Sequence, residues 1–77
     1  MRMLYEVAKD IQRDWNKISP YAAPYLNAMR ECSVPNDKFM HDDASSIVLY
    51  FLSNASSYRG ENAKKYKLEL KAICGFK

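Results

Sequence analysis

The sequence predicts an all-α protein: a small compact bundle of about four helices, in a single domain that spans residues 1–77. Three observations predict this class. The segment from Leu4 to Ile18 carries apolar residues at helical spacing, the run from Ile47 to Leu52 contains no polar residue, and no stretch alternates apolar and polar residues as paired strands do. A hydrophobic content of 48% with only two glycines is typical of a folded chain.

The first helix is expected over residues 3–18. Its apolar positions fall on one stripe: Leu4, Val7, Ala8, Ile11, Trp15 and Ile18. The opposite side carries acidic and basic residues three positions apart, which is typical of a solvated face. Pro20 ends the helix because it disfavours the helical conformation at Ser19.

The second helix is expected over residues 23–33. Pro20 and Pro24 both suit the first turn of a helix, but a helix that began at Pro20 would be interrupted by Pro24, so a start at Ala23 or Pro24 is preferred. A loop over residues 34–43 follows, in which Phe39 and Met40 are expected to fold back over the core.

The third helix is expected over residues 43–54, as the buried hub of the bundle. Its six-residue apolar run would also suit a strand, but the chain offers no partner strand. Asp42 or Asp43 suits the N-cap position. A segment that is apolar on every side has to be enclosed, so the other helices are expected to cover most of it.

The last helix is expected over residues 57–74, with Ser56 or Ser57 as its N-cap and Gly75 as its end. Gly60 falls within the first turns, where it either allows close approach to a neighbouring helix or marks a later start at Glu61. On this helix a row of lysines lies beside the expected core side, while Leu68 points away from the core.

The sequence contains no motif that indicates catalysis, so neither an enzyme nor a cofactor is expected. The cluster His41-Asp42-Asp43 could hold a divalent ion, but consecutive residues converge poorly on one metal, and we interpret it as an exposed histidine before a helix cap. Cys32 and Cys74 lack metal or redox spacing and are expected to be reduced thiols of a cytoplasmic protein. No signal peptide is expected, because the N-terminus passes quickly into charged sequence. No membrane association is expected either, because no apolar run approaches the roughly 20 residues that span a bilayer.

Charge is distributed unevenly along the chain, since residues 56–77 carry six of the twelve basic groups and only two of the nine acidic ones. Exposed tyrosine beside apolar and cationic groups is typical of a protein interface. The last helix also gathers an aromatic residue and several cations that could contact phosphates and stack a base: Tyr58, Arg59, Lys64, Lys65, Lys67 and Lys71. Glu61 and Glu69 interrupt this basic patch. The tyrosines suit the rim of a small core equally well. The predicted partner-binding residues are Tyr58, Arg59, Lys64, Lys67, Leu68 and Lys71.

Several segments resemble short helical proteins of tailed bacteriophages and prophages, a group with no established activity. The resemblance is carried by PYLNAM, by LYFLSNAS and by the step from Tyr58 to Glu61 followed by Ala63 and Lys64. It implies an origin and no mechanism. Small phage proteins without catalytic groups commonly bind a host protein, including defence nucleases such as CRISPR effectors, or sequester a small signalling nucleotide. We therefore expect an inhibitor of a host or antiphage-defence factor in the cytoplasm of a bacterial host cell. The alternatives are a nucleic-acid-binding accessory protein and a self-assembling structural protein. The small size of the core also predicts a homodimer or a larger homo-oligomer.

Overall fold

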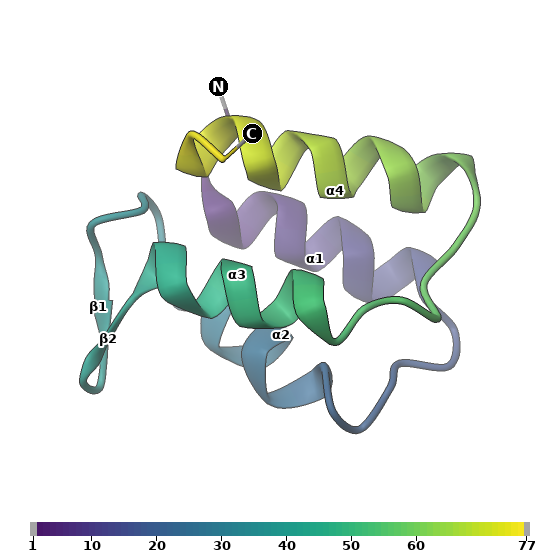
Figure 1. The fold of residues 1–77 in the computed structure, drawn as a ribbon, viewed down its shortest axis with the longest axis horizontal. Coiled ribbons are helices and arrows are strands. Elements are labelled where there is room, and N and C mark those ends of the chain that lie inside the picture. Colours follow the sequence, from purple (N-terminus) through teal and green to yellow (C-terminus); the bar gives the residue numbers. More distant parts are fainter. Residues whose placement is uncertain (1, 77) are drawn as a thin grey trace.

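The computed structural model describes residues 2–76, and in this part of the chain it contains four helices and one short hairpin (Figure 1). This confirms a small, mainly helical bundle. The elements in chain order are α1 (Leu4–Asp14), α2 (Ala23–Met29), β1 (Lys38–Phe39), β2 (Asp42–Asp43), α3 (Ala44–Ser53) and α4 (Glu61–Cys74). The helices pack in two pairs, α1 along α4 and α2 along α3, and further contacts between α1 and α2 and between α3 and α4 join the pairs.

The core lies between the two helix pairs. The stripe predicted on α1 is buried, since Leu4, Val7 and Ile11 are inaccessible to solvent and Ile18, beyond the helix, is half-buried. The largest fully buried side chains come from all four helices and the turn after α2: Phe51, Leu4, Ile11, Leu26, Met29, Leu70, Val7, Val48 and Cys32. Burial of these apolar groups is the main source of stability in a bundle of this size.

Two helices end earlier than their patterns predict. The first ends at Asp14, because Trp15 adopts an extended backbone, and its indole packs edge-on against Phe51 with the ring centroids 6.2 Å apart. The second begins at Ala23, as predicted, but ends at Met29. Beyond it, the carbonyls of Cys32 and Ser33 accept hydrogen bonds from the backbone N–H groups of Tyr5 and Leu4. The segment after α2 is therefore hydrogen-bonded to the start of α1 and does not continue the helix.

The third helix has the predicted position, with Asp43 and Asn54 as its flanking cap residues. The expectation that it is enclosed on most sides is wrong. Ile47, Val48 and Phe51 are buried, but Leu49 is 51% exposed and Tyr50 47% exposed. The reason is that α1 and α4 pack along each other, so that α3 is covered mainly by α2, with smaller contacts to α4 and β2.

The segment expected to be a loop contains an antiparallel pair of two-residue strands, in which Lys38 faces Asp43 and Phe39 faces Asp42. Phe39 packs against the core, as predicted. Met40 does not fold back over the core. It occupies the hairpin turn with a left-handed backbone (φ 59°) and is 85% exposed. The Asp43 carboxylate forms an ion pair with Lys38 and makes no side-chain cap to α3.

The last helix begins at Glu61, later than the expected residue 57, because Gly60 has a backbone (φ 113°, ψ 177°) that only glycine adopts easily. This decides between the two roles considered for Gly60. Gly75 ends the helix in the left-handed conformation (φ 74°), as predicted. The N–H of Phe76 donates to the carbonyl of Lys71 across this end, at 2.8 Å.

Candidate partner-binding surface

The six predicted partner-binding residues line one shallow depression of about 340 Å³ beside α4. Tyr58 and Arg59 come from the turn that precedes the helix, and the other four lie on one side of it. Gly60 and Ala63 complete the lining. The structure therefore brings the predicted residues together, but it gives Tyr58 and Lys67 contacts within the fold.

Tyr58 was expected at the surface, and that expectation is wrong. Its side chain is 2% exposed, and its ring stacks on Trp15 with centroids 4.9 Å apart and an interplanar angle of 19°. The phenol O–H donates to the Asp14 carboxylate at 2.7 Å. Burial, and then this hydrogen bond, raise the pKa of the Tyr58 phenol above its ordinary value. Tyr58 thus joins the turn before α4 to the end of α1.

Lys67, on α4, also binds the turn that precedes this helix. Its ammonium donates to the backbone carbonyls of Ala55 and Tyr58, each at 2.7 Å, and lies 5.7 Å from the centroid of the Tyr58 ring. Burial, followed by the neighbouring cations Arg59 and Lys71, lowers the pKa of Lys67. Because this ammonium joins two carbonyls of the turn, Lys67 holds the turn in place and is only partly available to a partner.

The remaining four predicted residues form the outer part of the depression. We call Arg59, Lys64, Leu68 and Lys71 the basic face. Leu68 is 55% exposed, Arg59 and Lys64 are exposed, and Lys71 is half-buried. Within residues 2–76 these three cations take part in no ion pair. The basic face therefore presents three cations around an exposed leucine.

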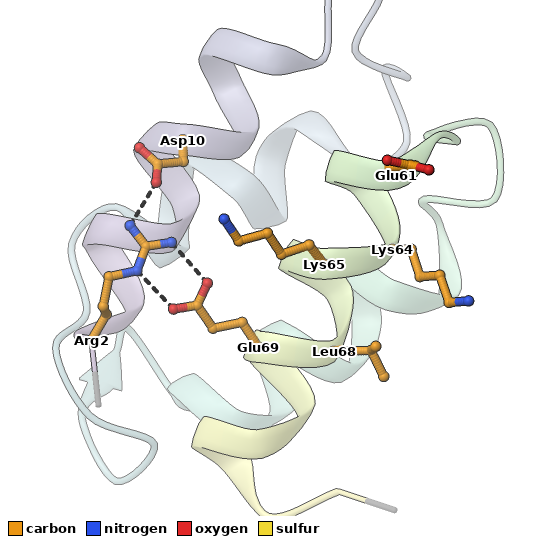
Figure 2. A pocket seen from close by; sticks show the side chains of 7 residues that line it. All are labelled: Arg2, Asp10, Glu61, Lys64, Lys65, Leu68 and Glu69. Atoms are coloured by element: carbon orange, nitrogen blue, oxygen red, sulfur yellow. Dashed lines mark hydrogen bonds and ion pairs between the residues drawn. The ribbon is translucent and has the colours of Figure 1, made fainter.

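A second, larger depression of about 810 Å³ lies between α1 and α4, on the other side of Leu68 (Figure 2). Its lining includes Arg2, whose guanidinium donates to both carboxylate oxygens of Glu69, at 2.7 and 2.8 Å, and to Asp10 at 2.6 Å. We call these three residues the Arg2 cluster. The hydrogen bonds from Arg2 lower the pKa of Glu69, and those to Glu69 and Asp10 raise the pKa of Arg2. Figure 2 shows Lys64 and Leu68 pointing away from this cluster.

The Arg2 cluster changes the charge balance of α4. Glu69 is one of the two acidic residues that interrupt the basic patch in the sequence, and it is turned toward α1 and neutralised there. Sequence reasoning missed this pair, because Arg2 and Glu69 are 67 positions apart and no local pattern indicates their contact. As a result, Glu69 does not offset the positive charge of the basic face, although its position in the sequence suggests that it would.

Other chemical groups do not gather into a site in the described residues. No set of three His, Cys, Asp or Glu side chains is close enough in residues 2–76 to hold a metal ion. Cys32 is buried and Cys74 half-buried, both as thiols, and burial raises the pKa of each. Over the same residues, no helix is long and apolar enough to cross a membrane.

Comparison of the chain with protein families, with curated proteins and with solved structures finds no match. The resemblance to phage proteins therefore stays a prediction from the sequence segments alone.

Proposed function

We propose that this protein acts by binding, and that its basic face binds an acidic surface of another protein. The observation that carries the proposal is the exposed Leu68 with Arg59, Lys64 and Lys71 around it, none of which pairs with an acidic group within residues 2–76. In a complex the partner would cover Leu68, and the charged groups would surround it. An apolar centre with a polar rim is the usual organisation of a protein interface. The cations would select an acidic partner and speed its association.

Nucleic acid is the other candidate for the same helix, and two contacts weigh against it. The Tyr58 ring is covered by Trp15, so it does not offer a face on which a base could stack. The Lys67 ammonium is engaged by two carbonyls. Arg59, Lys64 and Lys71 are then left for phosphates on this face, since Lys65 points toward Arg2 and Glu69 (Figure 2), and three cations are few for binding that depends on counterion release.

The resemblance to phage proteins is the support for the biological setting of this proposal. It favours a host or antiphage-defence factor as the partner, inhibited by occupation of its acidic surface inside the bacterial cell. The proposal requires no catalytic group, since inhibition of this kind depends on contact alone.

The test compares the wild-type protein with the triple variant Arg59→Ala, Lys64→Ala, Leu68→Ala, each immobilised and exposed to bacterial lysate. Proteins retained by the wild type and lost from the variant are identified by mass spectrometry, purified and titrated. We expect the variant to bind such a partner at least about 100-fold more weakly, since interface anchors each contribute about 1–2 kcal/mol or more. The three positions are exposed, so the fold is expected to persist.

The matched control is Lys17→Ala, which removes an exposed cation that lies beyond the end of α1 and outside the basic face. It should retain the same partner with unchanged affinity. Equal retention by the triple variant and the wild type would contradict the proposal. Retention of DNA that is lost both in the triple variant and on raising salt from about 0.05 to about 0.5 M would assign the face to nucleic acid instead.

A further inference from the structure

Charged residues are segregated between the two helix pairs. Helix α1 carries five and α4 six, whereas α2 and α3 carry none. Because α2 and α3 lie side by side (Figure 1), the segregation along the chain becomes a segregation in space. The surface that α2 and α3 form is therefore uncharged, in a chain where 27% of the residues carry charge, and the nearest charged groups lie at its ends: Arg30 after α2, and Lys38 and Asp43 in the hairpin.

The uncharged side exposes apolar and aromatic groups. On α3 its outward row follows the i, i+3, i+4, i+7 spacing of one helix face, and on α2 the ring of Tyr25 packs against Tyr50 with centroids 5.6 Å apart. Tyr21, in the turn that leads into α2, is 75% exposed. We call this set the uncharged face: Tyr21, Tyr25, Ser46, Leu49, Tyr50 and Ser53.

The exposed parts of Leu49 and Tyr50 gain little from the fold of one chain. About half of each side chain stays in water, where apolar area contributes no burial energy. Tyrosine and leucine without neighbouring charge have instead the composition of an interface centre, which is depleted in charged residues and enriched in aromatic ones. The face thus has the features of a contact surface, and it shares no residue with the basic face.

We propose that the uncharged face binds a second copy of this chain in a two-fold symmetric homodimer. In such a contact the same patch lies on both sides, so any charge it carried would face a like charge. The uncharged face avoids this repulsion, whereas the basic face would place cations against cations. A charged partner would find no opposite charge on the uncharged face. Dimerisation would also add apolar burial to a core near the lower size limit for stable domains.

The test measures mass by light scattering and sedimentation over concentrations from about 1 to about 500 µM. We expect the wild type to approach twice the 8.9 kDa of the single chain. Leu49→Lys places like charges in the contact and should weaken dimerisation at least about 10-fold. Ser53→Lys introduces the same charge at an exposed polar position without removing an apolar group, so it tests the face even if Leu49→Lys folds poorly.

The matched control is Leu68→Lys, which makes the same substitution at the exposed leucine of the basic face. It should leave the dimer intact. Partner capture is measured separately with the Arg59→Ala, Lys64→Ala, Leu68→Ala variant, so failure of this proposal is distinguishable from failure of the proposed function. Circular dichroism confirms that each variant is helical. A wild type that stays monomeric throughout the range would overturn the proposal, as would a dimer that resists both Leu49→Lys and Ser53→Lys.

Discussion

The Tyr58 ring stacks on the Trp15 indole, with centroids 4.9 Å apart, and its hydroxyl donates to Asp14, the last residue of α1. One side chain thus connects the turn before α4 to the end of α1 by an apolar and a polar contact. The ring forms the inner wall of the depression whose outer part is the basic face. Mutation of Tyr58 therefore tests the packing beneath the basic face and not the surface that a partner would contact.

Tyr58→Phe and Tyr58→Ala should separate these two contacts. Loss of the hydroxyl removes one hydrogen bond to a carboxylate, and we expect a cost of about 1–2 kcal/mol in the free energy of unfolding. Loss of the whole ring also leaves a cavity against Trp15, with an expected cost of about 3–5 kcal/mol. Urea titration followed by circular dichroism measures both. Equal costs for the two variants would mean that ring packing contributes nothing.

Lys67→Met should destabilise the turn although methionine keeps most of the aliphatic chain. The carbonyls of Ala55 and Tyr58 lose their charged donor, and we expect a loss of about 1–3 kcal/mol. The control is Lys64→Met, an exposed lysine on the same helix, which should change stability by less than about 0.5 kcal/mol. Thermal unfolding compares them, and an equal effect of the two substitutions would argue against a structural role for Lys67.

Gly60→Ala should cost more than Gly75→Ala. A Cβ at either position would meet no atom within 4 Å, so backbone conformation alone determines the difference. Gly60 adopts an extended conformation with positive φ that is almost restricted to glycine, at about 1–3 kcal/mol for other residues. Gly75 is left-handed, a conformation that costs alanine about 1 kcal/mol. Chemical denaturation ranks the two variants, and the reverse order would contradict the backbone argument.

Met40→Asn should leave the protein at least as stable as the wild type. Met40 is left-handed and 85% exposed, so it has an unfavourable backbone and little packing to lose. Asparagine tolerates this conformation better, and we expect a gain of up to about 1 kcal/mol. The melting temperature provides the measurement. A clear loss of stability would indicate that the Met40 side chain packs in the folded protein.

Acid should destabilise the protein through Glu69. Its pKa is lowered from 4.5 by Arg2, so the pair stabilises the fold above that pH, and this contribution is lost as the pH falls through the folded-state pKa. Asp14 and Asp37 act in the same direction, since hydrogen bonds lower their pKa from 3.8. Thermal unfolding from about pH 7 to about pH 3 should therefore show a shallower decline for Glu69→Gln than for the wild type. Identical slopes would contradict a stabilising Arg2–Glu69 pair.

Local patterns predicted the helices well, and the departures have identifiable causes. The apolar stripe on α1 and the turn signals around Pro24 and Gly75 act through neighbouring residues, and each of these helices lies within its predicted range. The hairpin escaped prediction because strands of two residues are too short to show alternation. The early end of α2 depends on a backbone pairing with the start of α1, far away in the sequence.

The sequence predicted which residues line the candidate site, but not which of them are exposed to a partner and which support the fold. All six residues line one depression. For five of them local spacing suffices, since Lys64, Lys67, Leu68 and Lys71 share one side of α4 and Arg59 lies just before it. The inward position of Tyr58 could not be inferred, since it depends on Trp15 and Asp14, and its hydroxyl bonds a residue 44 positions earlier.

The sequence by itself determined where the helices lie and where the charge is concentrated, because hydrogen bonding, helical period and the conformations of proline and glycine are local properties. The tertiary structure alone decided which side chains are covered where the local pattern gives no single apolar stripe. It buried Tyr58, exposed Leu49 and Tyr50, and paired Arg2 with Glu69 across 67 positions. Burial depends on which helices pack together, and that choice is made by contacts between distant segments, whose combined energy no local pattern contains.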